Sequence, residues 1–247
     1  MNNIFSLHNK TILITGASSG IGRQIAITAS QMGAAVIITG RDNQKLAATK
    51  ELIAGDCICI AADLVNENEI IDLISQLPKL HGVVFCAGVI DYTPIKFINA
   101  QKIASIFSIN FNSQVLLTQQ LLKNKKIEKA GSLVYVSSVS SKLGVAATSL
   151  YAASKAALTA FAKVTAAECA GQRIRSNSIC PGIVLTPMTD KAMEATSDES
   201  MDKASADYPL GYGMPEDVAG LAVYLLSDAS RWMTGSDILM DGGLTLK

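Results

Sequence analysis

Three polar residues in the second half of the chain have the types and the spacing that acid–base chemistry requires. Tyr151 and Lys155 stand four residues apart in a helical pattern, so both side chains should lie on one face, one turn apart. A free tyrosine has a pKa of about 10, and an ammonium that lowers it by about 3 units must supply roughly 4 kcal/mol. Ser138 follows a predicted strand, where its hydroxyl could bind a substrate oxygen. The three predict proton exchange with a substrate, although such a pair also occurs by chance and Ser138 could simply end a strand.

A glycine-rich loop near the N-terminus is typical of nucleotide binding. A predicted strand at 11–14 leads into it, and a helical pattern follows at once. Gly16 permits a tight turn, Gly20 lets backbone approach a pyrophosphate, and Gly22 lets the helix pack closely on the strand. The helix N-terminus would offer free N–H groups to the phosphates. A plain turn is the alternative. The pattern predicts a dinucleotide held by Gly16, Ser18, Ser19, Gly20, Ile21 and Gly22.

The end of the second predicted strand indicates which dinucleotide binds. An acidic residue there would accept from the ribose 2′-hydroxyl of NAD, but this chain has Gly40 followed by Arg41. Arg41 can pair with a 2′-phosphate, so NADP(H) is predicted, unless Arg41 is only a surface charge or Asp42 lies closer to the ribose. Asp63, after the third strand, is a candidate acceptor for the adenine amino group or an ordinary loop aspartate.

Short apolar runs alternate with longer helical patterns along the whole chain. The runs are nearly continuous in apolar residues, as expected for strands covered on both faces. The alternation predicts one α/β domain of residues 1–247, with a Rossmann-type, doubly wound, parallel seven-stranded sheet and helices on both faces. The irregular segment of about 183–213 is predicted to be a substrate loop. Strands are predicted at 11–14, 35–39, 57–61, 82–86, 132–137, 175–180 and 238–240, and helices near 20–32, 43–54, 66–76, 99–123, 151–170 and 215–227.

Composition excludes several classes of protein. Of 247 residues, 49% are hydrophobic and 17% charged, which predicts a packed core and argues against disorder. Lys plus Arg and Asp plus Glu both number 21, so no nucleic acid or anionic membrane is expected as a partner. Five cysteines and two histidines lack metal-ligand spacing, so no metal is expected. Without an apolar membrane span or a signal-peptide layout, the protein is expected to be cytoplasmic.

Short motifs follow one another in a fixed order over nearly the entire chain. They are TGASSGIG at 15–22, Asp63-Leu64, Ala87-Gly88, SIN at 108–110, Ser138, YAASK at 151–155, Pro181-Gly182, Thr186 and MDGG at 240–243. In these motifs the sequence resembles the short-chain dehydrogenase/reductase family. The resemblance implies an oxidoreductase acting on the CH–OH group of donors, which reversibly reduces a ketone to a secondary alcohol by hydride transfer from NADP(H).

The resemblance also implies a role for individual residues. Tyr151 would be the acid and base, Lys155 would lower its pKa and hold the nicotinamide ribose, and Ser138 would fix the carbonyl oxygen. Asn110 would anchor a water that links Lys155 to solvent. Further cofactor contacts would come from Asp63, Leu64, Cys86, Ala87, Gly88, Ile183 and Thr186.

One motif departs from the family pattern. Where the family usually has Asn-Asn-Ala-Gly, this chain has Phe85-Cys86-Ala87-Gly88, so two side-chain amides that would tie the cofactor loop to the strands are missing. We expect cofactor binding to persist, because Ala87 and Gly88 still allow close backbone approach. Local stability or affinity is expected to be weaker, and Cys86 is read as a buried structural thiol.

The substrate is less clearly indicated than the reaction. The stretch at 208–218 resembles 3-oxoacyl-[acyl-carrier-protein] reductases and related ketoreductases, whereas a sugar, steroid or other small alcohol used with NAD is the alternative. Tyr92, Val145 and Met188 are candidate substrate contacts and suggest a partly apolar pocket. The basic cluster at 123–129 precedes a strand, and so lies at the end of the sheet opposite the predicted site.

Two further expectations concern the partner and the class of protein. The alanine-rich helix at 151–170 and the helix at 99–123 would form the interface of a homotetramer or homodimer, as the resemblance implies. A non-catalytic, NADP(H)-sensing regulator would not need the tyrosine, the lysine, Ser138 and Asn110, all of which are present. The enzyme is therefore the favoured class.

Overall fold

A seven-stranded parallel sheet forms the centre of the molecule. The computed structural model describes residues 3–193 and 206–246. The strand order is β3-β2-β1-β4-β5-β6-β7, and every neighbouring pair is parallel. The reversal between β1 and β4 makes the sheet doubly wound, as predicted. The strands are β1 (Thr11–Thr15), β2 (Ala35–Gly40), β3 (Cys57–Ala61), β4 (Leu80–Phe85), β5 (Ile127–Val136), β6 (Arg175–Pro181) and β7 (Asp237–Met240).

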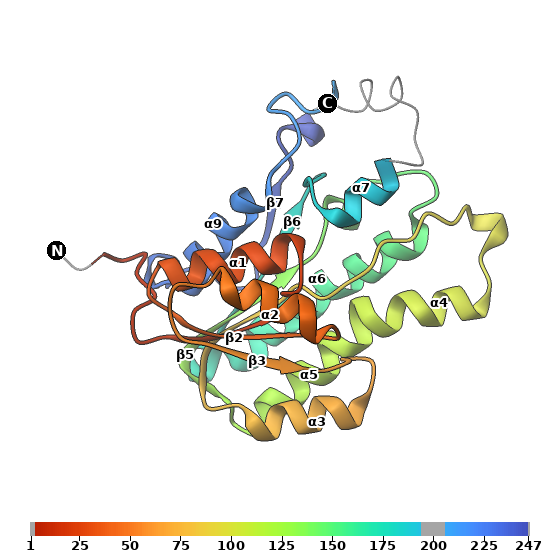
Figure 1. The fold of residues 1–247 in the computed structure, drawn as a ribbon. Coiled ribbons are helices and arrows are strands. Elements are labelled where there is room, and N and C mark those ends of the chain that lie inside the picture. Colours follow the sequence, from red (N-terminus) through yellow and green to blue (C-terminus); the bar gives the residue numbers. More distant parts are fainter. Residues whose placement is uncertain (1–2, 194–205, 247) are drawn as a thin grey trace.

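Helices cover both faces of this sheet (Figure 1). One buried apolar cluster unites the sheet with α1 (Gly20–Gln31), α2 (Asn43–Glu51) and α9 (Pro215–Leu226). A second cluster unites the other face with α3 (Glu67–Gln76), α5 (Ser113–Lys123) and α6 (Ser149–Cys169). Successive side chains of a strand point to opposite faces, which explains why these strands are apolar throughout.

Single strands show this division directly. In β1, Ile12 and Ile14 belong to the first cluster while Leu13 belongs to the second. In β5, Val134 lies in the first cluster, whereas Leu133 and Tyr135 lie in the second. Within the described part of the chain, no helix is long and apolar enough to cross a membrane.

The helix predicted at 99–123 is broken, and this prediction was wrong in detail. It consists of α4 (Ala100–Phe107), a π-helical turn (Ser108–Asn112) and α5. Such a turn widens the backbone and redirects one side chain, often at a functional site. Here it carries Asn110, whose amide is fully buried and exchanges hydrogen bonds with the backbone of Val89 at 2.8 and 2.9 Å. No glycine or proline marks this break in the sequence.

Two other boundaries also differ from the sequence prediction. The segment 183–213 contains a short helix, α7 (Pro187–Met193), where only a loop was expected; residues 194–205 of that segment lie outside the described residues. Strand β5 starts at Ile127, five residues early, because Leu80 pairs with Ile127 before a register shift. The basic cluster at 123–129 therefore spans the end of α5, a turn and the start of β5.

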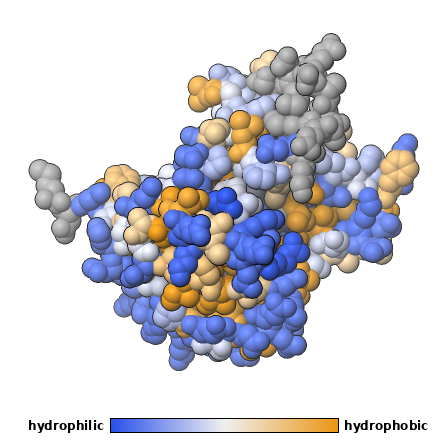
Figure 2. Space-filling view, in the orientation of Figure 1, coloured by the Kyte–Doolittle hydropathy of each residue, from blue (hydrophilic) through white to orange (hydrophobic). Residues whose placement is uncertain are grey.

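Strand β3 is one edge of the sheet, and its outer side is open. It pairs with β2 alone, and Ile58 on it is 55% exposed. Figure 2 shows apolar surface over this strand. The cavity described next lies elsewhere, at the carboxyl ends of the central strands.

Candidate active site

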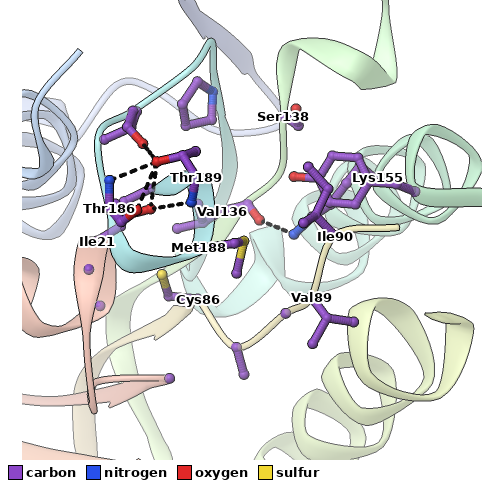
Figure 3. A pocket seen from close by; sticks show the side chains of 18 of the residues that line it. Ile21, Cys86, Val89, Ile90, Val136, Ser138, Lys155, Thr186, Met188 and Thr189 are labelled. Carbon is purple, nitrogen blue, oxygen red and sulfur yellow. Dashed lines mark hydrogen bonds between the residues drawn. The ribbon is translucent and has the colours of Figure 1, made fainter. Parts of the chain in front are cut away.

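A cavity of about 430 Å³ opens at the carboxyl ends of the strands, next to the point where the strand order reverses. Figure 3 shows side chains from distant parts of the sequence that line it. Of the candidate site residues predicted from the sequence, Asn110 and the alternative ribose contact Asp42 do not line this cavity, and the others do. They are Gly16, Ser18, Ser19, Gly20, Ile21, Gly22, Arg41, Asp63, Leu64, Cys86, Ala87, Gly88, Tyr92, Ser138, Val145, Tyr151, Lys155, Ile183, Thr186 and Met188.

The glycine-rich loop forms one end of this cavity. Gly16 has a φ of +67°, and a Cβ there would lie 2.8 Å from the Cα of Ala87, so both conformation and space require glycine. Ser19 precedes α1 with extended backbone and makes no side-chain cap, which leaves the start of the helix to a ligand. Arg23, which the sequence analysis did not single out, donates from its guanidinium to the carbonyl of Ser18 at 2.6 Å.

Thr15 contacts the segment in which the two amides are missing. Its hydroxyl oxygen accepts from the backbone N–H groups of Cys86 and Ala87, at 3.0 and 3.1 Å, and so ties β1 to the end of β4. Phe85 is fully buried and stacks on Tyr135, with ring centroids 4.4 Å apart and planes 5° apart. A hydroxyl and an aromatic pair therefore hold the end of β4, and the expected weakening of local stability or affinity stays a prediction.

Replacing Thr15 by valine is expected to destabilise the fold. The change keeps the volume but leaves two partly buried N–H groups without an acceptor, which costs about 2 kcal/mol of the free energy of unfolding. Thr15→Ser keeps the hydroxyl and is the control. Urea unfolding of the three proteins measures the difference. Equal stability of Thr15→Val and the wild type would show that the hydroxyl does not perform this function.

Beyond the glycine-rich loop lie the residues from which NADP(H) rather than NAD(H) was predicted. Asp42 does not turn toward the cavity: its carboxylate accepts from the backbone N–H of Lys45 at 3.1 Å and caps α2. Arg41 is exposed and forms no ion pair with any residue that the structure describes. A second hollow is lined by Ser18, Arg41, Asp42 and Lys45. Asp63 also lines the cavity, and its carboxylate accepts from the N–H of Val65.

The opposite end holds Ser138, Tyr151 and Lys155. Ser138 follows β5 and is buried, while Tyr151 and Lys155 lie in the first two turns of α6. The ammonium of Lys155 donates to the carbonyl of Val136 at 2.8 Å and lies 5.8 Å from the centroid of the Tyr151 ring. Ser137 donates to the carbonyl of Lys155, which fixes α6 to the end of β5. The fold thus brings together three side chains that could donate or accept a proton.

Burial shifts the pKa values of both Tyr151 and Lys155. Burial raises the pKa of Tyr151 to about 12, and hydrogen bonding by the Ser138 hydroxyl opposes this rise. Burial lowers the pKa of Lys155 to about 8. Desolvation is the largest cause of both shifts, so the role of Lys155 in lowering the pKa of Tyr151 stays a prediction.

Asn110 stands behind the cavity wall. Its amide nitrogen donates to the carbonyl of Val89 and to the hydroxyl of Ser154, at 2.9 and 3.1 Å. A Cβ added at Gly88 would lie 3.1 Å from the amide oxygen of Asn110 and 3.4 Å from the Lys155 nitrogen. A side chain at Gly88 would therefore require the Asn110 amide to shift by a few tenths of an ångström, while its contact with Lys155 would be ordinary.

The wall around Ile183 and Thr186 contains residues that sequence reasoning missed. Thr189 packs its hydroxyl into the turn, 2.8 Å from the N–H of Thr186 and 2.9 Å from the carbonyl of Val184 (Figure 3). The hydroxyl of Tyr208 accepts from the N–H of Ile183. In the sequence, Thr189 was indicated only by its position near Thr186, and Tyr208 only by its position in the 208–218 stretch. Leu244, near the C-terminus, also lines the cavity and had no signal.

The outer part of the cavity is mainly apolar. Tyr92, Val145 and Met188 are each roughly half-exposed at its rim, and Val89, Ile90 and Val139 extend the apolar wall. Cys86 points into the cavity in Figure 3, and burial raises its pKa to about 11, which keeps the thiol protonated. Hydroxyls of Ser140 and Thr148 are the nearby polar side chains.

A doubly wound sheet with a glycine-rich loop and a tyrosine–lysine pair in one cavity defines a nucleotide-dependent oxidoreductase. A family model described as enoyl-(acyl carrier protein) reductase matches residues 16–245. The chain is 33% identical to a 3-oxoacyl-[acyl-carrier-protein] reductase from Rickettsia felis, covering 98% of this chain and all of that one. The chain belongs to the short-chain dehydrogenase/reductase family.

Solved structures agree with this assignment. A short-chain type dehydrogenase/reductase from Mycobacterium marinum superposes with a TM-score of 0.91 at 28% identity, covering 99% of this chain and 98% of that one. A protein from Beutenbergia cavernae, described as a putative NAD(P)-dependent gluconate 5-dehydrogenase with bound NADP, reaches 0.89 at 29% identity, covering 99% and 100%. The protein is thus an oxidoreductase that acts on CH–OH groups with a nicotinamide dinucleotide.

Proposed function

We propose that this protein reversibly reduces a ketone to a secondary alcohol, with NADPH as hydride donor and Tyr151 as proton donor. The observation that supports this most directly is one cavity with the glycine-rich loop at one end and Ser138, Tyr151 and Lys155 at the other. A dinucleotide laid along it would bring its nicotinamide near Tyr151. A regulator that only senses NADP(H) would need the first end alone.

Each residue of this chain has a defined task in the proposed reaction. The bound cofactor supplies the hydride. Ser138 donates to the carbonyl oxygen and orients it toward the Tyr151 hydroxyl, which gives up its proton as charge develops on that oxygen. The pKa of about 12 keeps Tyr151 protonated at neutral pH, as an acid for reduction must be. Lys155, still an ammonium at pH 7, stabilises the phenolate that results. Asn110 holds the backbone of Val89 in the cavity wall.

The surroundings of Arg41 support NADPH rather than NADH. Gly40 offers no carboxylate, and Asp42 is already committed to capping α2. Arg41 borders the same hollow as Ser18 and forms no ion pair with the described residues. Lys45 in that hollow is instead paired with Asp42, so a 2′-phosphate would meet Arg41 as its cation.

Arg41→Ala is expected to raise the KM for NADPH by about 10- to 100-fold and to leave the KM for NADH nearly unchanged. A charge-assisted hydrogen bond of about 1.5–3 kcal/mol sets that range. Steady-state kinetics with both cofactors measures it. Lys79→Ala, at a surface ion pair outside the cavity, is the control. An equal change for both cofactors would mean that Arg41 does not recognise the phosphate.

The cavity wall supports a substrate whose ketone is flanked by an apolar chain. Among the described residues, the charged side chains of the wall are Arg41, Asp63 and Lys155. Arg41 and Asp63 border the glycine-rich end, so the carboxylate of a sugar acid would find no cation beside Tyr151 other than Lys155. A 3-oxoacyl thioester, neutral and apolar, fits this wall better than a polar keto-acid.

Consumption of NADPH with a panel of ketones tests the function. The panel contains short and medium 3-oxoacyl thioesters, neutral keto-sugars and keto-acids, each also with NADH. Turnover of a 3-oxoacyl thioester with NADPH is the expected result. Turnover only of keto-sugars or keto-acids would replace the substrate class, and NADPH binding without turnover of any ketone would favour the sensor.

A homotetramer is part of the proposal. The exposed side of α6 carries Val164, and that of α4 carries Ile103, at 56% and 43% exposure, so apolar surface lies on both elements that the family resemblance places at an interface.

A further inference from the structure

One buried carboxylate joins three elements around the candidate active site, although it does not line the cavity. Asp237 begins β7, and its side chain is 6% exposed. Its Oδ2 atom lies 2.6 Å from the Lys163 ammonium and 3.5 Å from the Lys142 ammonium. By contrast, the aspartate in the short ion pair of Lys10 with Asp228 is 78% exposed. The cluster of Lys142, Asp237 and Lys163 is therefore better shielded from solvent on its acidic side.

Both lysines belong to segments that carry proposed catalytic residues. Lys142 follows the short 3-10 turn Val139–Ser141 and is four residues beyond Ser138. Lys163 lies on α6, the helix that carries Tyr151 and Lys155. Asp237 lies on the edge strand β7, which runs beside β6 (Figure 1). One carboxylate thus ties the Ser138 loop and the Tyr151 helix to the same edge of the sheet.

A second set of contacts fixes the loop next to Lys142. The Ser141 hydroxyl donates to the carbonyl of Ser138 at 2.7 Å and lies 3.8 Å from the sulfur of Cys180. Cys180 pairs with Leu239 in β7, two residues from Asp237. The turn after Ser138 is thus attached to β6 through Ser141 and to β7 through Lys142.

The carboxylate depends on the lysines for its stabilisation. Its Oδ1 atom is buried and has no hydrogen-bond partner among the described residues, and the same holds for the hydroxyl of Ser178, which pairs with Asp237 in the sheet. A shielded charge with few other partners interacts strongly with the cations that it does have. Removing either lysine, or the charge itself, should loosen the element that the lost contact attached.

We propose that the cluster of Lys142, Asp237 and Lys163 sets the position of Ser138 relative to Tyr151, which makes Asp237 a positioning residue for the reaction. This inference rests on the proposed function, in which Ser138 and Tyr151 meet at one carbonyl oxygen. A small displacement of Ser138 would weaken both its contact with the substrate and its hydrogen bond to Tyr151.

The experiment compares Asp237→Asn and Lys142→Met with the wild type. Asparagine keeps the size of the side chain and removes its charge. Lys142→Met leaves the closer Lys163–Asp237 pair in place and removes only the attachment of the loop, so it provides the test if Asp237→Asn fails to fold. Asp228→Asn is the matched control, because it removes an ion pair of equal length that borders neither catalytic segment.

The expected result is a fall in kcat of about tenfold for Asp237→Asn and Lys142→Met, with the Kd for NADPH unchanged and Asp228→Asn like the wild type. A cluster that only stabilises the fold would lower the urea midpoint without changing kcat or the Tyr151 ionisation of the folded protein, and this outcome would overturn the inference.

A substrate-free measurement separates this inference from the proposed function. The pKa of Tyr151 is taken from ultraviolet difference titration of each protein against its Tyr151→Phe counterpart. It should rise in Asp237→Asn and Lys142→Met, because Ser138 no longer supports the phenolate. If the wild type reduces no ketone, the proposed function fails, and an unchanged Tyr151 titration in both variants would then overturn the positioning role by itself.

Discussion

Tyr151→Phe is expected to lower the turnover of ketones by about 10³-fold while leaving the Kd for NADPH within about twofold. Phenylalanine keeps the ring, which lies partly buried in the cavity wall, and removes only the proton that reduction requires. Initial rates of NADPH consumption and fluorescence titration of NADPH measure the two quantities. Tyr92→Phe, at the rim of the cavity, is the comparison, because it removes a hydroxyl that is not proposed to donate a proton.

The ionisation of Tyr151 also predicts how the free energy of unfolding changes with pH. The pKa of about 12 in the folded protein lies above the value of about 10 in an unfolded chain, so the protonated phenol favours folding. That contribution is fully present below pH 10 and is lost as pH rises from 10 to 12. It amounts to about 3 kcal/mol, from two units of pKa. Between those pH values the wild type should lose stability faster than Tyr151→Phe in urea unfolding.

Two outcomes would contradict the assignment of Tyr151. Retained turnover in Tyr151→Phe would require another proton donor, of which Ser138 is the nearest in the cavity. If the free energy of unfolding fell equally with pH in the wild type and in Tyr151→Phe, burial would not raise the pKa of the Tyr151 phenol.

The sequence was most informative where one physical constraint acted on many residues. Runs such as that of β1 are apolar on both faces, a pattern typical of strands covered by helices on both sides, so the fold was predictable. The glycine-rich loop was predictable because only glycine meets the demands of its positive φ angle and its close backbone contact at Gly16.

The sequence was least informative where a single tertiary contact decides the local structure. The π-helical turn at Asn110 exists because a buried amide meets the backbone of Val89, from a segment twenty-one residues away. The role of Thr15 as the acceptor for Cys86 and Ala87 likewise depends on the neighbourhood of β1 and β4. Thr15 and Asn110 both lie in motifs of the sequence, but the motifs do not reveal which backbone groups these side chains bind.

The pKa shifts of Tyr151 and Lys155 could not be predicted from the sequence for a related reason. Spacing indicated that the two side chains share a helix face, and they do, with the ammonium 5.8 Å from the ring. Spacing contains no information on solvent access. Burial is the largest cause of both shifts: it raises the pKa of Tyr151 and lowers that of Lys155.

Gly22→Ala is expected to abolish tight NADPH binding, raising the Kd by at least about 100-fold. Gly22 lies in the first turn of α1, and a Cβ there would be 2.4 Å from the carbonyl oxygen and 2.8 Å from the carbonyl carbon of Gly16. Both atoms are backbone, so the clash cannot be relieved by a rotamer change and must displace either the loop or the start of the helix. Either movement takes the N–H groups of the helix away from the phosphates.

Gly220→Ala is the matched control for this substitution. Gly220 lies exposed within α9, where an added Cβ meets nothing within 4 Å, so alanine should stabilise the helix by about 0.5–1 kcal/mol and leave NADPH binding unchanged. Fluorescence titration of NADPH and urea unfolding distinguish the two variants. If Gly22→Ala binds NADPH as the wild type does, the loop moves more freely than its contacts with Ala87 imply, and the phosphates must be held mainly by side chains such as Arg41.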